Sequence, residues 1–391
     1  MTLPAALGGP AAFPEPLPFA RPTIEEPGRI LGDIEAALAS GMVTNSSLVR
    51  ELETKAAAEF EVEHCVAVAS CTLGLMLVIQ AIDPQGPVLV PSFTFAASAH
   101  AVAWNGREIL FADCDPDTWL LRPEDVYGDP ALIMGVHISG VPVDYAGLAE
   151  VATDVGADLM FDAAHGAGSR VLVDGQLRPL GGFGRAEVFS LTPTKVLSGA
   201  EGGLITTNDA ELAERLRLAR DYGNPGDYDM RFAGLNARLS ELHAAVALAS
   251  LDHLETRVDH RNAVADRYRL LMAEIPGVGF QSVPDGSRSS YKDFTILINE
   301  AEFGASRDTV VAALAAEGVP TRPYYSPPVH RQTAYAHVVS PELPNTDRLA
   351  SQVISLPMWS HLPLEHAEKV AAAVSAIQQN ADAVSAAVQS G

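Results

Sequence analysis

The stretch "FSLTPTKVLSGAEGG" places one lysine, Lys195, between an apolar run and a glycine-rich turn. The chain contains only four lysines. Lys55 and Lys369 each follow a glutamate by four residues, the spacing of exposed ion pairs on a helix. Lys292 opens an apolar run and fits either a surface position or a substrate contact. Lys195 follows a strand expected to be buried. There a desolvated amine can act as a nucleophile, although a snorkelling surface lysine would fit equally well.

Other polar residues also stand where predicted strands end. Asp162 directly follows the run "LMF", and His165 comes three residues later. A carboxylate that leaves a buried strand requires a cationic partner, whereas the bland interpretation is a capping aspartate and a loop histidine. Ser70, Cys71 and Thr72 separate an apolar strand from a helix. The first N–H groups of such a helix can hold a phosphate, although a simple small-residue turn is commoner.

An aromatic side chain and a further hydroxyl complete the set. Phe95 lies at another strand end, where it can cover a flat ring or simply pack, and Ser190 precedes Lys195 by five residues. A lysine, a carboxylate, an aromatic ring, a histidine and a phosphate cradle are the groups that pyridoxal phosphate requires. The lysine forms an imine with its aldehyde, and the carboxylate keeps the ring nitrogen protonated. The residues together predict a site for this cofactor.

The elements that must position these residues follow a βαβ rhythm, which predicts a mostly parallel sheet covered on both faces. The run 202–207 follows the run 187–191 too closely for a helix to lie between them. We therefore expect it to pair antiparallel, at an edge of the sheet or as a return strand. From Leu239 the apolar residues take helical spacing and predict one long helix or two in tandem. A strand "DFTILI", a helix "SRDTVVAALAAEG" and a closing helix "PLEHAEKVAAAVSAIQQ" follow. The six predicted strands are 88–91, 109–114, 132–138, 159–164, 187–191 and 202–207.

These elements predict an N-terminal segment (1–29), a large cofactor-binding α/β domain (30–255) and a small C-terminal α+β domain (256–391). The net charge of −23 and the pI of about 4.7 argue against nucleic-acid binding. Three cysteines without a CxxC pair fit a reduced, cytoplasmic setting. The start of the chain lacks the pattern of a signal peptide, and polar residues interrupt the most apolar stretch, 65–82. We therefore expect no membrane association.

Seven motifs occur in order between about Pro18 and about Pro357: "PFARPTI", "SGMVTNSSLVRELE", "VPSFTFAASAHAV", "FDAAHG", "SLTPTKVLSGAEGG", "GLNARLSELHAA" and "RPYYSPPVH". As a set they are highly specific, and the chain resembles the DegT/DnrJ/StrS family of sugar aminotransferases. The resemblance implies the α/β fold of the fold-type I aminotransferases that depend on pyridoxal phosphate. It also implies a homodimer with active sites at the subunit interface.

The resemblance assigns Lys195 as the catalytic lysine that forms the imine. Asn236 matches the asparagine that reaches the phosphate of the partner subunit's cofactor. Cys71 and Leu73 depart from the smaller residues usual in the phosphate loop, and Val196 replaces a common asparagine, without removing a group that the mechanism needs. The residues that the resemblance implies for cofactor binding are Thr72, Leu73, Phe95, Asp162, His165, Ser190 and Asn236.

The implied reaction moves an amino group from glutamate or glutamine to a keto group of a nucleotide-linked deoxysugar. A dTDP-sugar is expected, in amino-sugar or antibiotic biosynthesis. A nucleotide diphosphate needs local positive charge, while tyrosine and histidine can contact the base or the sugar. The candidate substrate contacts are Arg231, Lys292, Arg322, Tyr324, Tyr325 and His330.

Four alternatives remain open. A cyclitol aminotransferase shares the family and needs no nucleotide site. A cofactor-dependent sugar dehydratase is disfavoured, because that branch of the family replaces the lysine with histidine and this chain keeps Lys195. A non-catalytic, cofactor-binding regulatory protein could lose Asp162 or Lys195, and both are present. A metal enzyme built on His137, Asp162 and His165 lacks a recognised ligand spacing, so we predict no metal.

Overall fold

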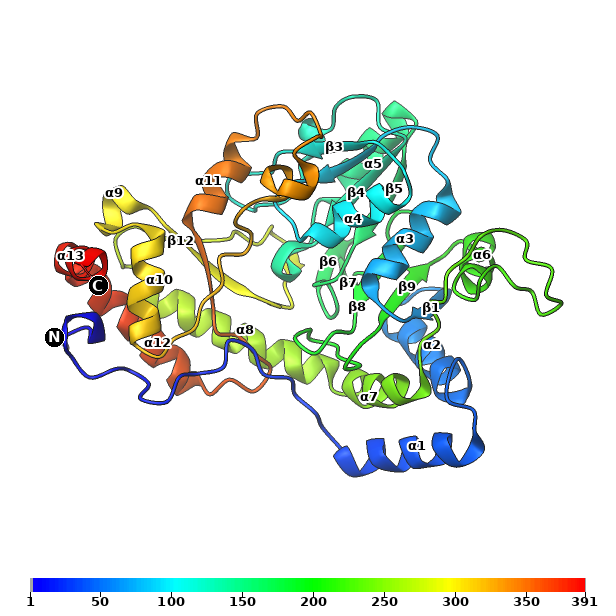
Figure 1. The fold of residues 1–391 in the computed structure, drawn as a ribbon, viewed down its shortest axis with the longest axis horizontal. Helices are drawn as coiled ribbons and strands as arrows, with labels where there is room; N and C mark the ends of the chain where they lie inside the picture. Colours follow the sequence, from blue (N-terminus) through cyan, green and yellow to red (C-terminus); the bar gives the residue numbers. More distant parts are fainter. Residues whose placement is uncertain (1–2, 391) are drawn as a thin grey trace.

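A seven-stranded sheet forms the centre of the larger part of the molecule, in the order β1-β9-β8-β5-β4-β2-β3 (Figure 1). The computed structural model describes residues 3–390. The pairs β2–β3, β2–β4, β4–β5 and β5–β8 are parallel, and β9 is antiparallel to both of its neighbours. The strands of this sheet are β1 (His64–Val68), β2 (Val88–Pro91), β3 (Ile109–Ala112), β4 (Leu132–Val136), β5 (Asp158–Asp162), β8 (Glu187–Ser190) and β9 (Gly203–Thr207).

Helices cover both faces of this sheet, as the βαβ rhythm predicts. Successive side chains of a strand point to opposite faces, and β1 shows the consequence. Val66 and Val68 pack in a core with α3, α4 and α6, whereas Cys65 and Ala67 pack in another with α2 and α7. The helices of this part are α1 (Pro27–Ser40), α2 (Ser47–Glu59), α3 (Cys71–Ile82), α4 (Ala96–Trp104), α5 (Tyr145–Val155), α6 (Ala210–Ala219) and α7 (Glu241–Leu251).

The prediction for the sixth strand, antiparallel at an edge or return, is confirmed in its second form. β9 is the next strand after β8, runs antiparallel to it and lies inside the sheet. The edge position belongs to β1, which pairs with β9 along its whole length, from His64 opposite Thr207 to Val68 opposite Gly203. This pairing joins segments about 140 residues apart, so local spacing could not reveal it.

The apolar pattern after Leu239 forms two helices in tandem, α7 and α8 (Leu254–Met272). α8 joins two cores, because Leu254 and Val258 pack with the large sheet while Tyr268 and Met272 pack in the smaller part. The division at residue 255 therefore stays a prediction. The smaller part contains β10 (Val278–Phe280), β12 (Phe294–Ile298), β13 (Val353–Leu356), α9 (Glu300–Phe303), α10 (Arg307–Ala316), α11 (Pro344–Gln352), α12 (Leu364–Gln379) and α13 (Ala381–Ser390).

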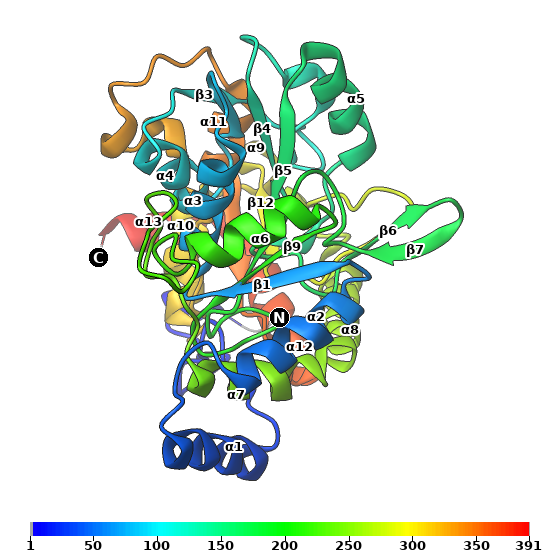
Figure 2. The same ribbon diagram turned by 90° about the vertical axis from the view of Figure 1, so that its right-hand side faces the viewer.

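Some local predictions need correction. The helix α12 does not close the chain, because α13 follows it. The strands β10, β12 and β13 of the smaller part form a second sheet. A third sheet, of β6 (Arg170–Val173), β7 (Gln176–Pro179) and β11 (Ser287–Arg288), projects from the body (Figure 2). The Lys55–Glu51 pair is confirmed at 3.2 Å. The predicted pair of Lys369 is wrong, since its ammonium lies over the Phe13 ring, 5.7 Å from the centroid.

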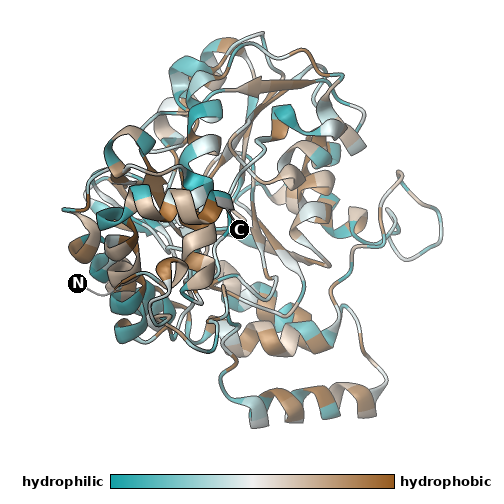
Figure 3. Ribbon diagram, turned by 60° about the vertical axis from the view of Figure 1, so that its left-hand side comes forward, coloured by the Kyte–Doolittle hydropathy of each residue, from teal (hydrophilic) through white to brown (hydrophobic). Residues whose placement is uncertain are grey.

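Two segments stand away from the body and expose apolar side chains. Helix α1 packs on α7 along one side, and its other side leaves Leu31 and Leu38 more than half exposed (Figures 1 and 3). The loop between α6 and α7 extends outward as well, with the Tyr228 side chain 86% exposed. Within residues 3–390, no helix combines the length and apolar character needed to cross a membrane.

Candidate active site

Four strand ends of the large sheet and two loops of the smaller part enclose a cavity of about 320 Å³. The carboxyl ends of parallel strands meet at one edge of a sheet, where α/β proteins place ligands. Nine of the residues predicted from the sequence line this cavity: Thr72, Phe95, Asp162, His165, Ser190, Lys195, Lys292, Tyr324 and Tyr325.

Lys195 follows β8 in a turn closed by its own N–H, which donates to the Thr192 carbonyl at 3.0 Å. Its surroundings favour the neutral amine. Desolvation in the cavity is the main cause, and the positive charge of Lys292 adds to it, so the pKa of Lys195 falls to about 7. Asp293, Cys71 and Asp162 act in the opposite direction but more weakly. An amine with this pKa is available as a nucleophile and as a proton carrier near neutral pH.

Asp162 is the last residue of β5 and is 4% exposed. Its carboxylate accepts hydrogen bonds from the Ser98 hydroxyl at 2.6 Å and from the Ala164 N–H at 3.0 Å. Burial nevertheless dominates and raises the pKa of Asp162. The carboxylate lacks a close cation among the described residues, although Lys195 and His137 exert a weaker favourable influence. A ligand that brings a positive charge to this carboxylate would compensate its burial.

His165 lies beside Asp162 in the loop after β5. Its Nδ1 accepts the N–H of Ser139 at 3.2 Å, so the proton of the neutral ring is on Nε2. Burial, and then the charges of Lys195 and Lys292, lower the pKa of His165 well below its usual value. The ring therefore stays neutral and can offer one N–H donor to a ligand oxygen.

The start of α3 forms the opposite end of the cavity. Ser70 caps the helix by accepting the Leu73 N–H at 3.2 Å, while Cys71 and Thr72 line the cavity. Gly203 of β9 lies flush against this turn, because a Cβ there would come within 2.7 Å of the Cys71 nitrogen. Ser190 pairs with Gly203 in the ladder of β8 and β9, and its hydroxyl lies 3.3 Å from that of Thr192. Helix N–H groups and hydroxyls of this kind hold phosphate.

The smaller part closes the cavity with a buried ion pair and two tyrosines. The Lys292 ammonium donates to both oxygens of Asp293, at 2.8 and 3.0 Å, and both residues are less than 10% exposed. The same ammonium lies 5.5 Å from the centroid of the Tyr324 ring. Sequence analysis missed Asp293, although it directly follows Lys292. It also missed Ser98, whose contact with Asp162 spans 64 residues and leaves no local signal.

Five predicted residues do not line this cavity. The backbone N–H of Leu73 serves the helix cap, and Arg231 pairs with Asp227 at 2.6 Å on the exposed loop. Asn236 is exposed at the base of that loop.

The other two are Arg322 and His330. The Arg322 guanidinium lies over the Phe19 ring, 5.2 Å from its centroid. His330 is buried elsewhere, with its Nδ1 2.6 Å from the Ser92 hydroxyl and its Nε2 3.3 Å from Asp347. Neighbouring positions in "RPYYSPPVH" thus face different surroundings, which the motif alone does not distinguish. The described residues also contain no cluster of three or more His, Cys, Asp or Glu able to hold a metal.

A sequence profile of the DegT/DnrJ/EryC1/StrS aminotransferase family matches residues 25–375. The chain belongs to this family. It is 33% identical over 356 residues to UDP-N-acetyl-3-dehydro-alpha-D-glucosamine 3-aminotransferase of Acidithiobacillus ferrooxidans, covering 89% of this chain and 91% of the relative. It is also 33% identical over 350 residues to dTDP-3-amino-3,4,6-trideoxy-alpha-D-glucose transaminase of Streptomyces venezuelae, covering 87% and 90%.

Solved structures agree. DesI, determined in the presence of its TDP-sugar product, superposes with a TM-score of 0.91 at 36% identity and 98% coverage of both chains. DesV of S. venezuelae, in complex with a ketimine intermediate, gives 0.84 at 31% identity, with 92% of this chain and 99% of DesV covered. The protein is a fold-type I aminotransferase of the DegT/DnrJ/EryC1/StrS family, and it depends on pyridoxal phosphate.

The residues of the cavity fit this cofactor. Pyridoxal phosphate supplies an aldehyde that an amine can capture and a pyridine ring that withdraws electrons. Lys195 is the amine, and the buried Asp162 carboxylate can accept a hydrogen bond from the protonated ring nitrogen. The turn at Cys71 and Thr72, with Ser190, offers donors for the phosphate. Two observations support this fit: within residues 3–390 the Asp162 carboxylate is buried without a close cation, and Gly203 has no side chain to fill the space beside the Cys71 nitrogen.

The lowered pKa of Lys195 predicts how the rate of cofactor capture depends on pH. Capture of pyridoxal phosphate by the cofactor-free protein, trapped with borohydride, should slow about tenfold for each pH unit below about 7, because only the neutral amine reacts. Mass spectrometry of the Lys195 peptide measures this rate, and the exposed Lys55 in the same digest is the internal reference. If both lysines gave the same pH profile, the environment of Lys195 would not be special.

Proposed function

We propose that this aminotransferase moves an amino group from L-glutamate, or glutamine, to a keto group of a nucleotide-linked deoxysugar, with a dTDP-sugar as the expected acceptor. Both curated relatives named above are nucleotide-sugar aminotransferases by name, one for a UDP-sugar and one for a dTDP-sugar. The solved structure with a TM-score of 0.91 was determined with a TDP-sugar product. The observation that carries the proposal is the single cavity shared by the Lys195 amine and the buried Asp162 carboxylate.

Each cavity residue has a role in this reaction. The Lys195 Nζ removes the α-proton of the amino donor and later delivers a proton to the sugar carbon that receives the amine. Asp162 would hold the proton on the ring nitrogen of a bound cofactor, which keeps the ring able to accept electrons. His165 would offer its Nε2–H to an oxygen of the cofactor. Lys292 is the cation of the cavity suited to an acidic group of the donor or the nucleotide.

We further propose a cytoplasmic homodimer that completes the site. Phe95 lines the cavity yet is 62% exposed, and Met230 on the loop between α6 and α7 is 44% exposed. An exposed apolar ring in the cavity wall and an exposed apolar side chain on a projecting loop suit contact with a second copy. In such a dimer Asn236 and Arg231, which stand outside the cavity of their own chain, would serve the cavity of the partner subunit.

Absorption spectroscopy tests the proposed function. The cofactor-loaded protein should show a visible band that L-glutamate bleaches, and addition of the correct keto-sugar should restore it. We would compare dTDP-linked, UDP-linked and cyclitol ketones and identify the amine product by mass spectrometry. Amination of a cyclitol alone would favour the cyclitol alternative, and loss of a sugar hydroxyl without amination would favour the dehydratase. A band that no amino donor bleaches would refute the proposal.

A further inference from the structure

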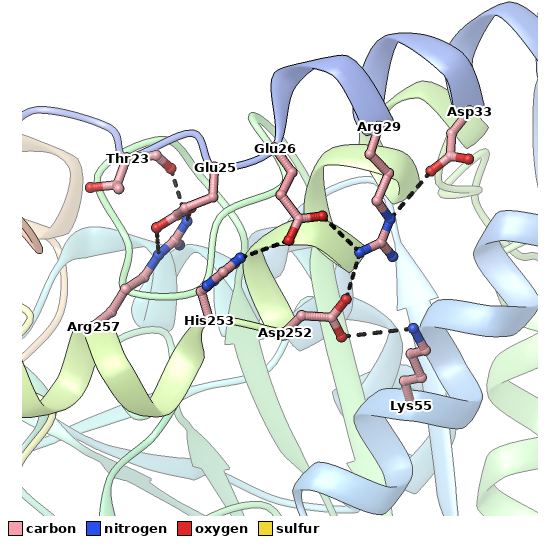
Figure 4. A network of polar contacts seen from close by, with 9 residues as sticks. All are labelled: Thr23, Glu25, Glu26, Arg29, Asp33, Lys55, Asp252, His253 and Arg257. Atoms are coloured by element: carbon pink, nitrogen blue, oxygen red, sulfur yellow. Dashed lines mark hydrogen bonds and ion pairs between the residues drawn. The ribbon is translucent and has the colours of Figure 1, made fainter.

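The guanidinium of Arg257 is buried between the N-terminal arm, defined here as residues 18–26, and the turn that carries Lys195. Figure 4 shows its contacts with the arm. Arg257 is in the first turn of α8 and is 3% exposed. A guanidinium has five N–H donors, and the Arg257 guanidinium donates five hydrogen bonds. Its acceptors are the Val196 carbonyl, the Ser250 hydroxyl, the Thr23 carbonyl and the two carboxylate oxygens of Glu25.

Two of these acceptors, the Val196 carbonyl and the Ser250 hydroxyl, connect Arg257 to the turn that carries Lys195. The Nη1 of Arg257 donates to the Val196 carbonyl at 2.8 Å, one residue after Lys195. It also donates to the Ser250 hydroxyl at 2.5 Å, and this hydroxyl accepts the Ser198 N–H at 2.9 Å. The backbone that follows Lys195 is therefore fixed at two points by one buried cluster.

The other three acceptors belong to the N-terminal arm. The Nη2 donates to the Thr23 carbonyl at 2.9 Å, and the Nε donates to one carboxylate oxygen of Glu25 at 3.0 Å while Nη2 contacts the other. Burial acts to raise the pKa of Glu25, but the hydrogen bonds and charge of Arg257 outweigh it and the pKa is lowered. Glu25 thus supplies a full negative charge to the buried guanidinium.

We propose that Arg257 is a positioning residue for Lys195, and that it holds this position only while Glu25 of the N-terminal arm is docked against it. Arg257 contacts both segments at once, through Glu25 and Thr23 of the arm and through the Val196 carbonyl of the turn. Removal of the Glu25 charge leaves a buried guanidinium without its counterion, which is strongly unfavourable. The guanidinium would then turn toward water and release the Val196 carbonyl and the Ser250 hydroxyl.

Release of the turn should change the pKa of Lys195 by letting water solvate its amine. The charged or titratable groups that act on the Lys195 amine are Lys292, Asp293, Cys71 and Asp162. Arg257 is not one of them, so its removal changes no charge in this set. A loosened turn lets water approach the amine, and desolvation is the main cause of its low pKa.

The test uses the capture of pyridoxal phosphate by Lys195 as a function of pH, together with thermal unfolding. In Glu25→Gln and in Arg257→Lys, we expect the apparent pKa of Lys195 to rise by about one unit, so that capture slows about fivefold at pH 7 and about tenfold well below pH 7. A lysine at position 257 cannot restore these contacts, because its ammonium has three donors where the guanidinium uses five. Arg29→Gln is the matched control, since Arg29 contacts Glu26 and Asp252 in the same network but is exposed (Figure 4).

The outcomes are distinct. A lower melting temperature with an unchanged pH profile in both variants would make Arg257 a purely structural residue and overturn the proposal. An equal shift in Arg29→Gln would also overturn it, because loosening of the arm in general would then suffice. If Arg257→Lys fails to fold, Glu25→Gln alone decides. Because the readout needs no donor or sugar, failure of the proposed substrate reaction would leave this test intact.

Discussion

Lys195→Ala is expected to lower turnover by about 10⁴-fold or more, because the nucleophile and the proton carrier are the same amine. The change should leave the fold intact, since the side chain points into the cavity and its neighbour Val196 carries the packing. The variant should still bind pyridoxal phosphate through the other cavity groups, but borohydride should no longer fix the cofactor to the protein. Turnover assays and intact mass after borohydride measure the two effects.

Lys55→Ala is the control for this prediction. Lys55 is exposed and pairs with Glu51 and Asp252 at the surface, far from the cavity residues. Its removal should change neither turnover nor borohydride labelling. Near wild-type turnover in Lys195→Ala would contradict the assignment of the catalytic lysine.

Asp162→Asn should retain the cofactor but lower turnover by at least about a hundredfold, since a neutral amide cannot stabilise a protonated ring nitrogen. Burial raises the pKa of Asp162, so its ionised form opposes folding of the cofactor-free protein. The cofactor-free wild type should lose stability as the pH rises above the usual aspartate range, and Asp162→Asn should not show this loss. Melting temperature against pH, measured without cofactor, checks the second effect.

Ser98→Ala is the matched comparison, because it keeps the carboxylate and removes the hydrogen bond of 2.6 Å to it. A small loss of turnover is expected, of about tenfold or less. If Asp162→Asn and Ser98→Ala reduced turnover equally, the hydrogen bond rather than the charge would be the important feature. If Asp162→Asn instead destabilised the cofactor-free protein at neutral pH, the carboxylate would not be an uncompensated charge.

The sequence by itself was sufficient for the residues that follow predicted strands. Asp162 stands directly after a short apolar run, Lys195 follows another within a few residues, and Thr72 starts a helix after a third. Parallel strands bring such positions to one edge of a sheet, so strand spacing alone predicts that they meet. The structure places all three in one cavity. The motifs around them also sufficed to indicate the family, which the comparisons confirm.

Only the tertiary structure decided the contacts that join distant segments. It placed β1 outside β9 and separated His330 from Tyr324 and Tyr325. It also decided between the two positions open to Lys292, which is a buried partner of Asp293 that lines the cavity. The physical reason is the range of the interactions. Apolar periodicity and helix caps depend on neighbours within a few residues, whereas burial and charge compensation depend on which segments meet in space. The contact of Arg257 with Glu25, across 232 residues, has no local signal and exists only in the folded chain.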